Sequence, residues 1–132
     1  MAKKKPYEVS LLMEWMTRLG LQDWSIAMET GCSPCDMAIV GTLGCTSWEE
    51  STKSAVIQIV DPEKIDREKL VRDFDFEEVL VHELLHLKTC LLNSKDEEED
   101  LGDRILHQIV DDLARAMVAL KKENSKSKEK QL

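Results

Sequence analysis

The sequence predicts a small α+β domain built from one helix, then three strands, then two further helices. Apolar residues recur at helical spacing near the start of the chain and again in its second half. The stretch between them alternates in polarity or is rich in β-branched residues, as strands are. With 132 residues, of which 42% are hydrophobic and 33% charged, the chain is long enough for one folded domain. Because helices and strands occupy separate parts of the chain, an α+β class is expected.

The first half of the chain contains the N-terminal helix and two of the strands. Tyr7–Leu19 has apolar residues three and four apart, which predicts an amphipathic helix that stops at Gly20. Trp24–Glu29 alternates large apolar with smaller or polar residues, as a half-buried strand does. Gly31–Asp36 has the composition of a turn. The apolar segment Met37–Leu43 is therefore predicted to be the second strand.

The second half completes the predicted sheet and adds two helices. Cys45–Lys53 is polar and is expected to be a connection, whereas Ala55–Val60 is β-branched and is predicted to be the third strand. A helix is expected from Phe76 to about Leu92. Ser94 is the expected N-cap of a last helix, whose apolar positions run from Ile105 to Leu120. The sheet is thus predicted to be small and three-stranded, followed by two helices.

The net charge of −8 is unevenly distributed and separates a domain from two tails. Residues 1–6 and residues 121–132 each carry a net charge of +3, which leaves −14 on the predicted domain at residues 7–120. The last twelve residues have no apolar pattern and are expected to be disordered. A domain with this negative charge repels the phosphate backbones of nucleic acids. No nucleic-acid partner is therefore expected.

Location and redox state follow from what the sequence lacks. No apolar run approaches the roughly 20 residues that cross a bilayer, and no apolar segment follows the basic start as it does in a secretory signal. We therefore expect a cytoplasmic protein without membrane contact. Cysteines in that compartment are thiols. Cys32 and Cys35 form a lone C-x-x-C, a weak signal, so thiols are favoured over a second metal site completed by Cys45 and either Cys90 or a carboxylate.

The strongest chemical signal is a His-Glu-x-x-His pattern inside the leucine-rich helix. Residues four apart on a helix lie one turn from each other, so His82 and His86 can bind one zinc ion. Glu83 lies on the same side, turned slightly away, which suits a general base acting on zinc-bound water. The alternative is a chance match with both histidines hydrogen-bonded in the core. Burying two histidines and a glutamate without a partner is costly, which favours the metal.

A catalytic zinc site needs a third protein ligand and an open position. His107, on the following helix, is the preferred third ligand because a helical hairpin returns it beside the first pair. Asp103, Asp111 and Glu97–Glu99 are the alternatives, and a further one is that His107 is an ordinary half-exposed helix residue. Asp111 is also expected to accept a hydrogen bond from a ligating histidine, either His107 or, across the helix interface, His82.

These motifs resemble those of zincin metallopeptidases, most closely the minimal gluzincin-type domains, called minigluzincins, and the small zincin-like proteins often encoded in phages and prophages. The resemblance extends over residues 19–120. It is carried by Leu-Gly-Leu-Gln-Asp-Trp-Ser-Ile, Ala-Val-Ile-Gln-Ile, Leu-Val-His-Glu-Leu-Leu-His-Leu and His-Gln-Ile-Val-Asp-Asp-Leu-Ala-Arg-Ala. In gluzincins a glutamate is the third ligand and an aspartate follows four residues later. Here His107 and Asp111 stand at those positions, and Leu92 stands where the metzincin pattern has its third histidine.

The resemblance implies a minimal zincin-like fold and hydrolysis of peptide bonds, with Zn²⁺ on His82, His86 and His107 and with Glu83 as the base. It also implies that the strand at Ala55–Val60 lines the cleft and pairs with an extended peptide or protein substrate. Gluzincins commonly use a tyrosine or histidine to stabilise the oxyanion, and Tyr7 is the only tyrosine in this chain. The alternative function is therefore a catalytically silent zincin-fold protein of phage or mobile-element origin that binds metal and acts by interaction.

Overall fold

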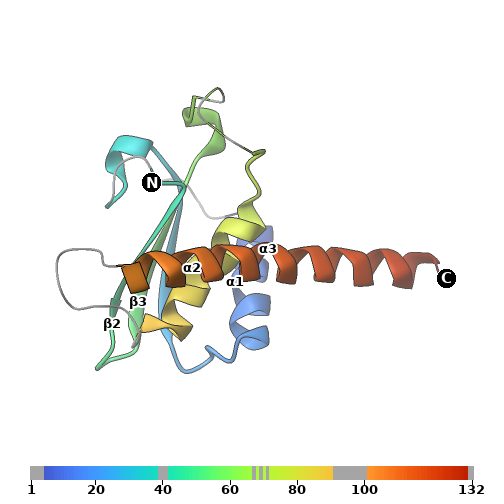
Figure 1. Cartoon of the computed structure of the whole chain (residues 1–132), viewed down its shortest axis with the longest axis horizontal. Coiled ribbons are helices and arrows are strands. Elements are labelled where there is room, and N and C mark those ends of the chain that lie inside the picture. Colours follow the sequence, from blue (N-terminus) through green and yellow to red (C-terminus); the bar gives the residue numbers. More distant parts are fainter. Residues whose placement is uncertain are drawn as a thin grey trace.

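The computed structural model describes residues 5–38, 42–66, 68, 70, 72–90 and 101–130, except for the side chains of residues 129 and 130. It has the predicted α+β class (Figure 1). The elements, in chain order, are α1 (Pro6–Arg18), β1 (Ser25–Cys32), β2 (Gly44–Glu49), β3 (Ser54–Val60), α2 (Phe76–Lys88) and α3 (Leu101–Lys130). Two short 3₁₀ turns, at Pro34–Asp36 and Pro62–Lys64, lie in the connections.

The three strands form one mixed sheet in the order β1-β3-β2. β3 runs parallel to β1, with Ser25 opposite Ser54, and antiparallel to β2, with Gly44 opposite Ile59. The prediction of a strand at 55–60 is confirmed. This strand lies between the other two, a position that suits its β-branched residues because they pack well against neighbouring strands. Ile57 and Ile59 are fully buried.

The second strand is the main correction to the predicted fold. The structure forms β2 at Gly44–Glu49, so all of this strand except Gly44 lies in the segment 45–53 that was expected to be a connection. The strand expected at 37–43 is wrong for the four described residues in that range. Residues 39–41 lie outside the described part of the chain. β2 is polar because it is an edge strand with one half-covered face. Its half-buried residues Thr46 and Trp48 alternate with the exposed Ser47 and Glu49. Met37 instead joins a small separate cluster of buried residues with Cys45 and Val60.

The N-terminal helix forms where it was predicted. Its start is closed by the Glu8 side chain, which accepts a hydrogen bond from the backbone N–H of Lys5. Its end is marked by Gly20, whose φ of 70° lies in the left-handed region that glycine adopts easily. Trp15 is 1% exposed, and its indole Nε1 donates to Glu77 Oε2 at 2.7 Å. The helix thereby joins the main core. Its start differs from the prediction, because Lys5 and Pro6, which were assigned to the basic tail, already belong to the cap and first turn of the helix.

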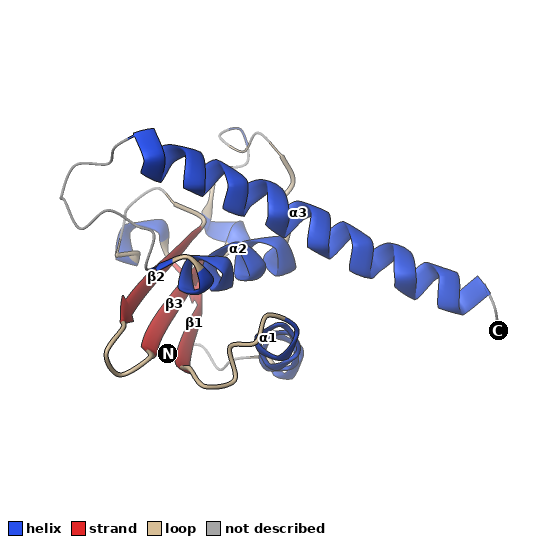
Figure 2. Cartoon of the chain, turned by 60° about the horizontal axis from the view of Figure 1, so that its bottom comes forward, coloured by secondary structure: helices blue, strands red, loops and turns tan. Residues whose placement is uncertain are grey.

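Helix α2 lies between the sheet and α3 (Figure 2). The Asp75 side chain caps it by accepting from the backbone N–H of Glu78. Its buried residues face both neighbouring layers and are Leu80, Val81, Glu83, Leu84, Leu85 and Leu87. The helix ends at Lys88, with Thr89 as its C-cap, while the last two residues of the predicted helix and the expected Ser94 cap lie outside the described residues.

Helix α3 is longer than predicted. It packs on α2 through Val110, Ala114 and Val118, each 1% exposed, and continues to Lys130. This differs from the disordered tail expected from residue 121. Lys121 forms ion pairs with Glu77 and Glu14, so the first turn of the expected tail is held against α2 and α1. Among the described helices, none is both long and apolar enough to cross a membrane.

Candidate metal centre

The structure brings together the three histidines of the predicted site. His82 and His86 lie one turn apart on α2, with ring centroids 5.0 Å apart. His107 reaches them from α3, with its ring 4.8 Å from that of His82 and 5.3 Å from that of His86. Each ring offers a nitrogen, and these nitrogens all lie within 4.8 Å of one another. Within the described part of the chain this is the only group of three or more histidine, cysteine or acidic residues close enough to hold a metal ion.

Asp111 is a hydrogen-bond partner of the cluster and not one of its members. Its Oδ1 lies 3.3 Å from Nδ1 of His82, so of the two histidines considered for it the structure selects His82. With Nδ1 directed at a carboxylate, the Nε2 of that ring is left to bind a metal. Asp103 is not in the cluster either, and Glu97–Glu99 lie outside the described residues.

Arg115 extends this chain of polar contacts by one more residue. It is one turn after Asp111 on α3 and forms an ion pair with Asp111 Oδ2. Burial acts to raise the pKa of Asp111, but the hydrogen bond and charge of Arg115 outweigh it and lower that pKa. The carboxylate therefore stays ionised while it faces His82.

The two histidines of α2 are disposed to be neutral. Partial burial lowers the pKa of His86 to about 4, and the neighbouring rings of His82 and His107 add to the effect. Burial likewise lowers the pKa of His82, against the opposing influence of Asp111. Neutral imidazoles keep the lone pair that a metal requires. The pair can therefore bind a cation near pH 7 without first releasing a proton.

Glu83 is buried against the edge strand. Its side chain is among the few charged groups of the described residues that lie in the core, with 6% exposure. Thr46 Oγ1 donates a hydrogen bond of 2.6 Å to Glu83 Oε1. Burial raises the pKa of Glu83 to about 7, although the Thr46 hydrogen bond works in the opposite direction. A carboxyl group with this pKa can both accept and release a proton near neutrality.

Gly44 allows β2 to approach the base closely. A Cβ atom at position 44 would lie 2.8 Å from Glu83 Oε2 and 2.8 Å from Val79 Cγ1, which is closer than such atoms pack. Neither Gly44 nor Thr46 was predicted to take part in the site. Thr46 lies in the segment expected to be a connection, and Gly44 lies just before that segment. The signal available for them was the alternation of Thr46 and Trp48 with exposed residues, a short pattern in a polar stretch.

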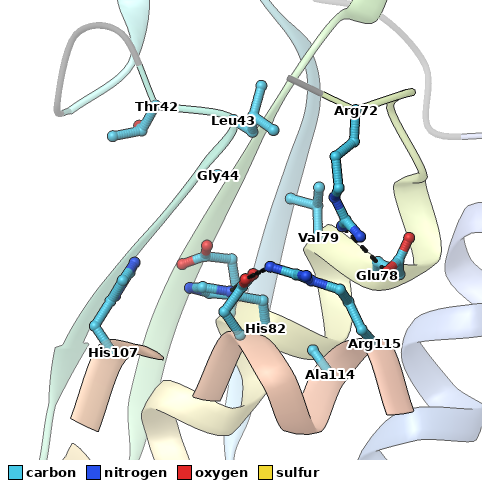
Figure 3. A pocket seen from close by; sticks show the side chains of 12 residues that line it. Thr42, Leu43, Gly44, Arg72, Glu78, Val79, His82, His107, Ala114 and Arg115 are labelled. Atoms are coloured by element: carbon cyan, nitrogen blue, oxygen red, sulfur yellow. Dashed lines mark hydrogen bonds and ion pairs between the residues drawn. The ribbon is translucent and has the colours of Figure 1, made fainter. Parts of the chain in front are cut away.

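His82, His107 and Glu83 border a cleft between the start of β2 and the two helices (Figure 3). In this view His82 and His107 point from their helices into the cleft, and Leu43 and Gly44 form the wall across from them. The cavity has a volume of about 270 Å³. A second cavity of about 700 Å³ lies next to it, and Arg72 and Arg115 line both of them. Arg72 is paired with Glu78 at 3.3 Å.

Two other groups of residues considered from the sequence lie away from this cleft. Tyr7 is 56% exposed on α1 and packs against Phe76, with ring centroids 6.0 Å apart. It does not line the cavity beside the histidines. The four cysteines form no disulfide, and none of them belongs to a metal-binding group among the described residues.

The prediction that a substrate pairs with the strand at Ala55–Val60, which is β3, is wrong. β3 is hydrogen-bonded to β1 on one side and to β2 on the other, so it has no edge for a peptide. β2 is the edge strand beside the cleft, since Gly44 is its first residue. No family model, curated protein or solved structure matches the chain.

Proposed function

We propose that the protein is a zinc-dependent metallopeptidase of the zincin type. In this proposal His82, His86 and His107 hold the ion and Glu83 is the general base. The observation that carries it is the position of His107: a residue of α3 lies within 4.8 Å, atom to atom, of the two histidines of the α2 motif. A chance His-Glu-x-x-His pattern gives no reason for a third histidine to meet the other two.

The donor set is chemically suited to zinc. Imidazole nitrogen is a preferred ligand of Zn²⁺, and three protein ligands leave one tetrahedral position for water or substrate. Burial keeps His82 and His86 neutral, as ligation requires. Asp111 fixes the orientation of the His82 ring, which is the usual arrangement around a ligating histidine.

The residues of the chain divide the catalytic work in the proposed reaction. Bound zinc supplies Lewis acidity, which polarises a peptide carbonyl and lowers the pKa of water. Thr46 holds Oε1 of Glu83, so Oε2 is the atom that accepts the proton and later passes it to the leaving amine. The exposed edge of β2 is the place for an extended peptide, whose backbone would add to the sheet.

A second candidate is a silent zincin-type protein that binds metal without hydrolysis. One observation favours it. Arg72 and Arg115, the arginines that line the cleft, are each already paired with a carboxylate, Glu78 and Asp111 respectively. Neither is therefore poised to stabilise an oxyanion without first giving up its partner.

The test combines metal analysis with a peptide-library digest. The purified chain should contain about one equivalent of zinc, and His107→Ala should reduce it, whereas Gln108→Ala, one residue away and exposed, should not. Cleavage of library peptides that a chelator stops and zinc restores would support the peptidase. Glu83→Gln should keep the zinc and abolish the cleavage. Zinc without cleavage supports the silent protein, and no zinc in any variant contradicts both.

A further inference from the structure

We propose that α3 binds a second copy of the chain through an apolar stripe on its outer side. The stripe consists of five large residues that are between 47% and 64% exposed: Leu101, Ile105, Ile109, Leu113 and Leu120. They follow one another at intervals of four residues and finally seven, so they share one side of the helix. Ala116, also exposed, fills the longest interval.

The stripe is separate from the face with which α3 packs into its own domain. Val110, Ala114 and Val118 form that buried face, each at 1% exposure. A residue such as Ile109 is rotated by about 100° from Val110 around the axis. Helix α3 thus has two apolar faces, and the described residues of the chain cover only one of them. Single exposed apolar residues are common, but a continuous row over five turns of helix is typical of an interaction surface.

A second copy fits the stripe because the stripe is complementary to itself. When two α3 helices are placed antiparallel with a two-fold axis near residue 111, Leu101 faces Leu120 of the other copy. In the same register Ile109 faces Leu113 and Ile105 faces Ala116. Each apolar residue thereby meets another one, which is the arrangement an isologous two-fold interface requires.

The charges at the two ends of the helix favour the same antiparallel orientation. The last turns of α3 extend beyond the other elements (Figures 1 and 2), and residues 121–130 contain five lysines and two glutamates. The chain just before Leu101 contains the run Asp96–Asp100, whose structure is outside the described residues but whose sequence is five consecutive acids. Lys121 and Lys122 are already paired with carboxylates of their own domain, so the comparison rests on the three lysines after them. An antiparallel pair brings this basic end toward an acidic start twice, whereas a parallel pair would bring six such lysines together.

Sedimentation equilibrium of the full chain over a wide concentration range tests the proposal. We expect a monomer–dimer equilibrium in which Ile109→Glu with Leu113→Glu raises the dissociation constant by about 30-fold or more, because four charges would enter an apolar contact. The matched control is Arg104→Glu with Gln108→Glu, which places two glutamates at exposed positions rotated by about 100° or more around the axis from both Ile109 and Leu113. The control should leave the dissociation constant within about twofold.

Circular dichroism shows whether each variant is folded. If the double variant is unfolded, Leu120→Glu replaces it, because Leu120 is close to the end of the packed part of α3. Lys126→Glu with Lys128→Glu tests the orientation: at low salt it should weaken an antiparallel dimer. A chain that stays monomeric at every concentration overturns the proposal. That result is expected if other residues of the same chain cover the stripe. A dimer that ignores the stripe substitutions overturns it too, and a dimer strengthened by the lysine substitutions overturns the antiparallel register.

Discussion

Replacing Glu83 by glutamine should stabilise the metal-free protein, and the gain should depend on pH. The pKa of Glu83 is raised from 4.5 to about 7 because the carboxylate is buried. The folded state therefore binds this proton more tightly than the unfolded state does. Ionised Glu83 then costs stability, increasingly so between about pH 4.5 and pH 7, and the full cost is reached above pH 7. At 1.36 kcal/mol per pKa unit the cost is about 3 kcal/mol, which Glu83→Gln removes.

The assay is urea denaturation of both proteins in chelator, at a series of pH values from 4.5 to 8. The lowered pKa of His86 also destabilises the fold as the pH falls below 6.5, but that contribution is common to both proteins and cancels in their difference. The gain from Glu83→Gln should be near zero at pH 4.5 and largest at pH 8. Glu49→Gln, on the exposed side of β2, is the control and should give a flat difference. A difference that is constant with pH, or a Glu83→Gln protein that is less stable at pH 8, would refute the reasoning.

Three further predictions concern the ligands and the edge strand. His107→Ala should weaken zinc binding by at least about 100-fold in a competition titration while circular dichroism stays unchanged; equal affinity would exclude it as a ligand. Asp111→Asn should weaken zinc binding by about 10–100-fold, since the substitution removes the carboxylate that faces His82, and an unchanged affinity would contradict that role. Gly44→Ala should cost about 1–3 kcal/mol in urea denaturation, because the added methyl group meets Glu83 and Val79, and a neutral effect would show that β2 can move away.

The parts of the fold that the sequence predicted well depend on local periodicity. Helix α1 and strand β3 have strong patterns over their whole length, and they form within about one residue of the predicted bounds. The histidine cluster was predictable for a related reason. Two of its members lie on one helix at a spacing fixed by helix geometry, and the third lies on the next helix, which a hairpin returns to the first.

The parts that the sequence did not predict depend on contacts that are distant along the chain. β2 has few apolar residues, and its strand conformation is stabilised by pairing with β3 and by contact with α2. The roles of Gly44 and Thr46 follow from that contact. Beyond residue 120 the sequence has no apolar pattern that would predict a helix. Lys121 and Lys122 form ion pairs with acidic residues of α1, of α2 and of the α2 cap, and these residues are too distant along the chain for the pairs to be predicted. Substrate pairing with β3 was an implication of the family resemblance. The strand order that puts β2 at the edge could not correct it in advance, because strand order is not encoded in a strand's own composition.

The division of the three imidazoles between two helices has a consequence for stability. An ion held by His82, His86 and His107 would act as a cross-link that ties α3 to α2. Such an ion would bind the folded chain and not the unfolded one, so the melting temperature should rise with the concentration of free zinc. At a zinc concentration a hundredfold above the dissociation constant, the free energy of unfolding should increase by about 2.7 kcal/mol. Chelation would then loosen the outermost layer of the domain first, and cellular metal supply would govern how long the folded chain survives.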